Sequence, residues 1–324
     1  MESAAETIQR IFGDSKSSLG IELADLTSRY HALDSVKYPH PDQTRFIAVA
    51  NQKGGVGKTS SAVNLAAAMA ISGSHVLVID MDPQGNASTA FNVPHASGDP
   101  SVYDVIEGRK GIAEVKLACP DIENLDVVPA SIDLSGAELE LADMDNRNNL
   151  LKDALQEYLN QCEIHYDYVF IDCPPSLGLL VINAMCAARE MLIPIQAEYY
   201  ALEGLGQLIR TIGLVQQHYN PILVVSTMLV TMFDKRTLLG REVFQEVKNH
   251  YPNIVLDTTI PRTVKIPEAP SFNQSVITYD PHGAGAISYR EAALEIAKRS
   301  QTVLAVISSK QEALRSANEE ESGR

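Results

Sequence analysis

Cysteine is scarce in this 324-residue chain, and its four copies form no functional pattern. They include no C-x-x-C pair and no spacing typical of zinc ligands. The sequence therefore gives no support for a zinc site or a redox motif, and we expect reduced, buried thiols of the kind found in the cytosol. The four residues are Cys119, Cys162, Cys173 and Cys186.

Basic residues are also in the minority. The chain has 41 Asp and Glu against 26 Lys and Arg, for a formal net charge of −15. This balance argues against a protein that coats nucleic acid through bulk charge, although a local basic patch can exist on an acidic protein.

Long apolar runs are missing as well. The longest, at 177–195, is interrupted by Asn183, Arg189, Glu190 and Pro194. It predicts a buried helix followed by a strand, and no membrane span. The first residues, MESAAE, have neither the basic nor the apolar segment of a secretory signal. Together with the reduced thiols, this predicts a cytoplasmic protein.

The most informative segment present is the glycine-rich stretch NQKGGVGKTS at 51–60. It follows a strand-like run at 46–50 and precedes a helix-like run at 61–71, as a phosphate-binding loop requires. The glycines let backbone N–H groups turn toward phosphate oxygens, and the helix start adds its positive dipole end. Lys58 is placed to neutralise the β- and γ-phosphates, and the Thr59 hydroxyl to bind Mg²⁺. The predicted nucleotide contacts in this loop are Lys53, Gly54, Gly55, Val56, Gly57, Lys58, Thr59 and Ser60.

Acidic residues end two of the apolar, strand-like runs. Asp172 follows the run at 168–171 and is placed like a Walker B aspartate, which holds Mg²⁺ through a water. Asp80 and Asp82 follow the run at 75–79, and alternation puts them on the same face of the chain. One can support the metal shell while the other orients an attacking water. A lone Asp at a strand end is usually a turn or cap residue, but three acids beside a phosphate loop favour a magnesium–nucleotide site.

Strand-like and helix-like segments alternate from residue 45 onward. This alternation predicts an α/β fold of the P-loop type, with a doubly wound, mostly parallel sheet and helices on both faces. We predict strands at 46–51, 75–80, 125–128, 167–172, 190–195, 222–230 and 254–260. We predict helices at 58–72, 147–162, 176–188, 201–218, 236–250 and 284–308.

Three segments are expected along the chain. Residues 1–44 form a polar, partly helical extension and linker, 45–308 the P-loop ATPase domain, and 309–324 a disordered acidic tail. In the extension an apolar stripe could serve for docking, although a locally packed helix explains it equally well. The stripe consists of Leu19, Ile21, Leu23, Leu26, Tyr30 and Leu33.

The motifs, taken in order, resemble the ParA family of DNA-partitioning ATPases. The phosphate loop has Gln52 in place of the usual first glycine, and its second lysine, Lys53, defines the deviant Walker A box. The segments DMDPQGNAS and FIDCPPSLG, which begin at Asp80 and Phe170, are similar to the other two nucleotide boxes. The resemblance covers about residues 45–305 and is strongest to chromosomal members. It continues through EYYALEG at 198–204, TMFDKRT at 231–237, IPR at 260–262, EAP at 268–270, YDP at 279–281 and GA at 285–286.

The resemblance implies a Mg²⁺-dependent ATPase that forms a homodimer with ATP. By similarity, Lys53 contacts the ATP of the partner subunit, so that Lys53, Lys58 and Asp82 are the catalytic residues. Asp82 would be the hydrolytic aspartate, with Asp80 as an outer-shell support of the metal. Thr59 and Asp172 would be the magnesium residues. A ParB-like centromere-binding partner would stimulate slow hydrolysis.

The resemblance further implies non-specific DNA binding and association with the nucleoid. Arg236 and Lys265 match the family's DNA-binding surface, and Arg262 lies nearby in sequence. Arg262 can instead border the adenine pocket, together with Pro261. For each of these three basic residues, the alternative interpretation is an ordinary solvated charge on the surface. Contacts to phosphates carry no sequence code and make binding salt-dependent.

One loop departs from the family pattern. The family usually has a serine where Pro267 stands, and small or polar residues where Phe272 and Asn273 stand. Pro267 removes an N–H group and stiffens the loop, so we expect its geometry to differ here.

Three alternatives share parts of this pattern. A MinD-like regulator of division has the same nucleotide boxes but ends in a basic amphipathic membrane helix, whereas this chain has three glutamates at 319–321. An electron carrier like nitrogenase iron protein needs cysteines that hold a cluster between subunits, and no such motif is present. An orphan ParA paralogue that positions other cargo cannot be separated from chromosome partitioning by sequence.

Overall fold

The computed structural model describes residues 18–141, 144–198 and 201–322. Within these residues, seven strands form one sheet in the order β3-β4-β2-β5-β1-β6-β7. All neighbouring pairs are parallel except β3 and β4. The strands are β1 (Arg45–Val49), β2 (Val76–Asp80), β3 (Leu117–Ala118), β4 (Leu125–Val128), β5 (Tyr168–Asp172), β6 (Glu190–Gln196) and β7 (Val224–Thr231).

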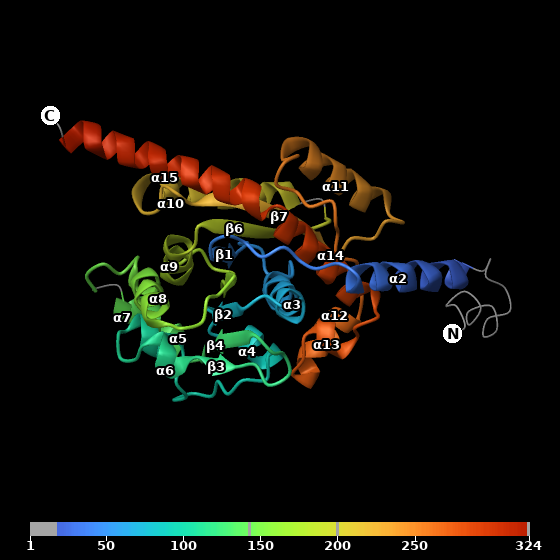
Figure 1. The fold of residues 1–324 in the computed structure, drawn as a ribbon, viewed down its shortest axis with the longest axis horizontal. Helices are drawn as coiled ribbons and strands as arrows, with labels where there is room; N and C mark the ends of the chain where they lie inside the picture. The colour runs from blue at the N-terminus through green and yellow to red at the C-terminus, as the bar shows by residue number, and fades with distance from the viewer. Residues whose placement is uncertain (1–17, 142–143, 199–200, 323–324) are drawn as a thin grey trace.

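Helices cover both faces of the sheet, which confirms the predicted doubly wound α/β fold (Figure 1). Alternate residues of each strand point to opposite faces, so Ile47 and Val49 pack with α3 and α14, whereas Ala48 packs with α8, α9 and α10. The longer helices are α2 (Ser18–Asp34), α3 (Lys58–Ile71), α8 (Leu150–Gln161), α9 (Leu179–Ala187), α10 (Ala201–His218), α11 (Leu238–His250), α14 (Ala284–Lys298) and α15 (Ser300–Ser322). The shorter ones are α4 (Asn86–Ala90), α5 (Val102–Ile106), α6 (Ile112–Val115), α7 (Leu134–Glu140), α12 (Lys265–Glu268), η2 (Ala269–Phe272) and α13 (Val276–Tyr279).

The register of the central strands brings the expected functional residues together. Asp172, the last residue of β5, lies opposite Asp80 of β2 on one side and Val49 of β1 on the other. The phosphate loop follows β1 directly. The carboxyl ends of three adjacent parallel strands therefore meet at one edge of the sheet, where doubly wound folds bind their ligands.

The strand predicted at 254–260 is wrong. The structure has only isolated bridges there, Met228 with Val255 and Phe233 with Pro261. The backbone N–H groups of Asp257 and Thr258 donate instead to the Glu295 carboxylate of α14, at 2.9 and 3.0 Å. These donors are therefore not available for a strand ladder.

The tail predicted to be disordered at 309–324 is instead helical as far as Ser322, where α15 ends; residues 323–324 lie outside the described residues. Its segment KQEALR at 310–315 consists of residues with high helix propensity. Lys310 ties the helix to the sheet by donating to the carbonyl of Leu223 at 3.2 Å. The single helix predicted at 284–308 is divided at Arg299, which donates to Glu295 and to the carbonyl of Val255.

Residues 18–34 of the N-terminal extension form α2, which packs on α14. Arg29 donates to both oxygens of Glu291, at 2.8 and 2.6 Å, and Arg290 donates to Asp34 at 2.7 Å. Ile21, in the first turns of α2, is 60 % exposed. In Figure 1, α2 and α15 extend from the body on opposite sides. No helix among the described residues is long and apolar enough to cross a bilayer.

Candidate nucleotide-binding site

The phosphate loop has the backbone that its glycines predict. Gly55 and Gly57 have φ values of 74° and 85°, in the left-handed region that side chains disfavour. Gly57 is the N-cap of α3, so the free N–H groups of the first helical turn point toward the loop. Thr231, at the end of β7, holds the loop by donating to the carbonyl of Val56 at 2.8 Å. The result is an anion cradle at a helix N-terminus.

The two lysines of the loop have different surroundings. Lys58 is buried, and its Nζ donates back to the carbonyl of Lys53 at 3.2 Å. Burial lowers the pKa of Lys58, although the carboxylates of Asp172 and Asp82 offset part of this effect. The Lys53 side chain is 39 % exposed, and its Nζ lies 2.9 Å from the Glu198 carboxylate. Lys58 therefore faces its own cradle, whereas Lys53 points out of it.

Glu198 is a contact that the sequence did not predict. Its other oxygen accepts a hydrogen bond from Gln196 at 2.6 Å and lies 3.7 Å from the guanidinium of Arg262. Glu198 thus links the loop lysine to the segment that contains Pro261 and Arg262. The two members of the Lys53–Glu198 pair are 145 residues apart, so local patterns carry no signal for it.

Asp80 is fully buried and accepts three hydrogen bonds. They come from the backbone N–H groups of Ser88 and Asp82, at 2.9 and 3.1 Å, and from the Ser88 hydroxyl at 2.7 Å. Burial raises the pKa of Asp80 to about 6, against these hydrogen bonds, which lower it. Asp80 therefore fixes the turn that carries Asp82. Its expected role as an outer-shell support of the metal stays a prediction.

Asp172 has a very different environment from Asp80. Its carboxylate is fully buried, and neither oxygen has a hydrogen-bond partner among the described residues. Burial and the nearby carboxylates of Asp80 and Asp82 raise its pKa well above the usual value, while Thr59 and Lys58 act in the opposite direction. An orphaned buried carboxylate of this kind fits a cation.

These residues fit Mg²⁺ bound together with phosphates. The described part of the chain has no group of three or more His, Cys, Asp and Glu side chains that could hold a metal alone. Mg²⁺ typically takes one or two protein ligands and completes its shell with waters and substrate phosphates. Thr59 and Asp172 supply that number of groups, next to the cradle.

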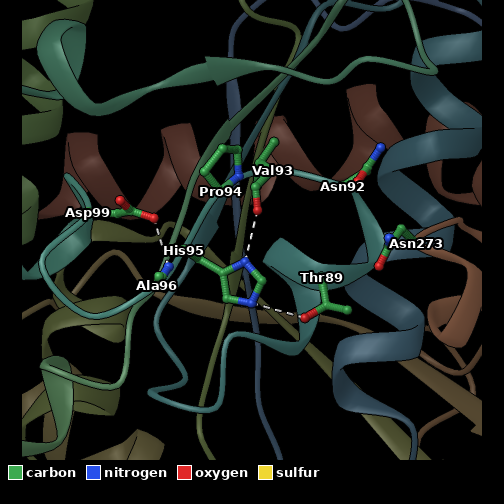
Figure 2. Close-up of a pocket in the computed structure, with 8 residues that line it drawn as sticks. All are labelled: Thr89, Asn92, Val93, Pro94, His95, Ala96, Asp99 and Asn273. Carbon is green, nitrogen blue, oxygen red and sulfur yellow. Dashed lines mark hydrogen bonds between the residues drawn. The ribbon is translucent and has the colours of Figure 1, made fainter.

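A pocket of about 570 Å³ lies beside the turn that carries Asp82 (Figure 2). His95 contacts the Thr89 hydroxyl at 3.1 Å and the Val93 carbonyl at 2.8 Å. A Cβ atom at Gly85, whose φ is 62°, would lie 2.7 Å from the His95 ring. His95 therefore packs directly on this turn. Sequence reasoning missed it, because an isolated histidine carries no motif.

The basic residues predicted for DNA each have an acidic partner in the structure. Arg236, 85 % exposed, pairs with Asp234 at 2.9 Å, and Lys265 pairs with Glu268 at 2.9 Å. Arg262 lies close enough to Asp234 to contribute to its low pKa, after the larger effect of Arg236. Arg262 therefore lies between Asp234 and Glu198, and its roles in adenine binding and DNA binding stay predictions.

The loop that departs from the family pattern lies next to the phosphate loop. Pro267 and Thr59 both line a cavity of about 290 Å³. Phe272 is 57 % exposed and stacks on Tyr279 with a centroid distance of 5.0 Å, and Asn273 has a φ of 55°. The Lys265 ammonium lies 5.3 Å from the centroid of the same Tyr279 ring.

Comparison with known proteins agrees with this geometry. The AAA domain family matches residues 44–225. The sporulation initiation inhibitor protein Soj of Bacillus subtilis is 47 % identical over 253 residues, which cover 78 % of this chain and 98 % of that protein. The chromosome partitioning protein ParA of Myxococcus xanthus is 45 % identical over 255 residues, or 79 % of this chain and 88 % of that protein.

A crystal structure of cobyrinic acid a,c-diamide synthase from Mycobacterium smegmatis, with bound ADP and magnesium, is also similar. Its TM-score is 0.68 at 36 % identity, and the match covers 80 % of this chain and 96 % of that one. The sequence matches, together with the paired lysines of the phosphate loop, lead to one conclusion: the chain belongs to the ParA family of ATPases.

Proposed function

We propose that this protein is a chromosome-partitioning ATPase whose Mg²⁺-ATP state is a homodimer that binds DNA without sequence preference. Hydrolysis, stimulated by a ParB-like partner, returns it to a form that releases DNA. The names of the two curated relatives support partitioning as the process. ADP and magnesium in the similar crystal structure support the choice of ligands.

The observation that carries the proposal is the different orientation of Lys53 and Lys58. Lys58 is buried and directed into its own cradle, so it can neutralise phosphates bound there. Lys53 is partly exposed, and its ammonium pairs with Glu198. An exposed lysine at the rim of a phosphate site can reach a nucleotide held by a second subunit, once it leaves Glu198.

The chain's own residues account for slow hydrolysis. The turn anchored by Asp80 holds Asp82, which is placed to orient an attacking water. Thr59 and Asp172 would hold Mg²⁺, which neutralises developing charge on the phosphates when bound. Within the nucleotide boxes no arginine completes the site, so turnover stays low until a partner or second subunit adds positive charge.

Release and capture of DNA would follow the oligomeric state. A chain with a net charge of −15 repels DNA except where basic residues gather, and dimerisation doubles such a patch. Arg236 and Lys265 are the proposed phosphate contacts, and each must compete with its acidic neighbour.

Two single variants test the proposal. Lys58→Ala should weaken nucleotide binding itself, because it removes the charge inside the cradle. Lys53→Ala should bind ATP as a monomer but fail to dimerise. Nucleotide affinity by fluorescence and mass by light scattering, both with Mg²⁺-ATP, would measure the two effects. Equal loss of affinity in both variants would contradict the proposal.

A further inference from the structure

A separate cavity lies at the end of the sheet opposite the phosphate loop. Its volume is about 480 Å³, and its lining comes from the start of β1 and the residues before it, from α8, and from the end of α9 and the residues after it. The strand β1 starts beside this cavity and ends at the phosphate loop, so about 16 Å of strand separates the two. The volume is in the range of small-ligand sites, about 300–1,000 Å³.

Arg189, in the wall of this cavity, is the feature that points to a ligand. Its guanidinium lies 5.0 Å from the centroid of the Phe46 ring, and the described residues give it neither an ion pair nor a side-chain hydrogen bond. Both carboxylate oxygens of the adjacent acid, Glu190, accept hydrogen bonds from Arg45, at 2.8 and 2.6 Å. Burial lowers the pKa of Arg189. The Glu190 carboxylate offsets part of this effect, but no carboxylate among the described residues contacts the Arg189 guanidinium directly. A half-buried cation in this position is costly, and an anionic ligand would relieve that cost.

Apart from the exposed carboxylate of Asp42, the rest of the lining fits an anion with an apolar part. Leu155 and Phe46 provide apolar surface, and Lys152 adds a second, exposed positive charge. The framework is held by Asn220, whose side chain donates to the carbonyls of Met185 and Ala188 at 2.8 and 2.7 Å and so fixes the end of α9. The cavity is therefore formed before any ligand binds.

We propose that this cavity binds a small organic carboxylate, with its two oxygens on Arg189 and its apolar group against Phe46 and Leu155. One guanidinium matches the geometry and single charge of one carboxylate. A phosphate dianion would call for a second buried cation, whereas Lys152 is exposed. A free carboxylic acid and the C-terminus of a peptide offer the same chemistry, and the test separates them.

Isothermal titration calorimetry on the full chain provides the test. The probes are hexanoate, its uncharged match 1-hexanol, and the peptide Ala-Ala-Leu as free acid and as C-terminal amide. Hexanoate should bind and 1-hexanol should not. The peptide acid should bind more tightly than its amide if a chain end is the natural ligand, and more weakly than hexanoate if a free acid is.

Arg189→Gln should weaken hexanoate binding at least about tenfold, the loss typical of a charge-assisted hydrogen bond. Arg210→Gln, the same change on an exposed residue of α10, should leave it unchanged. Arg189→Lys keeps the charge without the forked geometry and should bind with intermediate affinity, which guards against misfolding of the glutamine variant. Equal binding of hexanoate and 1-hexanol, unchanged binding in Arg189→Gln, or no binding of any probe would overturn the proposal.

Discussion

At the scale of single residues, Asp172 and Asp80 divide the work of the site. The Asp80 carboxylate accepts three hydrogen bonds from Asp82 and Ser88, whereas the Asp172 carboxylate accepts none among the described residues. The sequence placed both acids at strand ends but could not assign these environments. They depend on Ser88, eight residues beyond Asp80 along the chain, and on the strands that bury Asp172.

The orphaned carboxylate predicts an unusual stability effect. Asp172→Asn should stabilise the nucleotide-free protein at neutral pH by about 1–3 kcal/mol, because it removes a buried charge whose burial Thr59 and Lys58 only partly offset. Urea denaturation measures this change. Asp167→Asn serves as the matched control, and it should destabilise, because Asp167 is buried but accepts from the backbone N–H of His75 at 2.9 Å.

The pH dependence follows from the same carboxyl group. Its pKa is raised in the folded state, so between the unfolded value, 3.8, and the folded value the native protein binds the extra proton. The free energy of unfolding should therefore fall as pH rises through that window, and less steeply in Asp172→Asn. An asparagine variant that is less stable than wild type at neutral pH would contradict this account.

Asp82 carries the third prediction at this scale. Asp82→Ala should keep ATP binding and dimer formation but lose hydrolysis, because the water loses its orienting carboxylate while the cradle stays intact. Phosphate release and size-exclusion chromatography with ATP would check both parts. Normal turnover by a monomeric Asp82→Ala protein would rule the assignment out.

At the scale of helices and strands, local pattern was a good guide wherever packing agreed with it. The predicted helix at 201–218 coincides with α10, and the helix at 58–72 differs from α3 by one residue. Local pattern gave a wrong prediction where a distant side chain accepts the backbone hydrogen bonds, as the Glu295 carboxylate does at 257–258. The two-residue strand β3 was missed because so short a strand has no periodicity.

The residues of the nucleotide site could likewise be predicted where they belong to a local sequence pattern. The phosphate loop and the three acids follow from glycine spacing and strand ends, which are local. Glu198 and His95 were not found, because each acts through contacts set by the fold. The roles of the site residues in catalysis and DNA binding stay predictions.

The attachment of α2 to α14 is testable as an element. Arg29→Ala removes a two-pronged pair with Glu291, so amide hydrogens of 18–34 should exchange several-fold faster while ATP affinity stays the same. Asp25→Ala, which removes a pair of 3.6 Å whose acid is 62 % exposed, should change exchange little. Equal exchange in both variants would show that other contacts hold the helix.

At the scale of the whole molecule, the DNA surface must overcome an acidic chain. Arg236→Glu with Lys265→Glu should abolish salt-dependent DNA binding and leave ATP-dependent dimerisation untouched. Asp234→Asn with Glu268→Gln should instead strengthen binding, because it frees the two cations from their acidic neighbours. Filter binding across a salt series distinguishes these results. Binding that persists in the glutamate variant, or that needs no ATP, would place the DNA surface elsewhere.

The central claim is that Lys53 acts on the nucleotide of a second subunit, and mixing two inactive variants tests it most directly. Lys53→Ala keeps the cradle lysine Lys58, and Lys58→Ala keeps Lys53, so neither homodimer has a complete site. In a mixed dimer, ATP held by Lys58 of one subunit can meet Lys53 of the other.

The measurement is phosphate release by each variant alone and by their mixture, at equal total protein. The account predicts that the mixture regains ATPase activity that neither variant has alone. A mixture as inactive as its parts, in which light scattering still detects mixed dimers, would contradict it, since Lys53 would then be acting within its own loop.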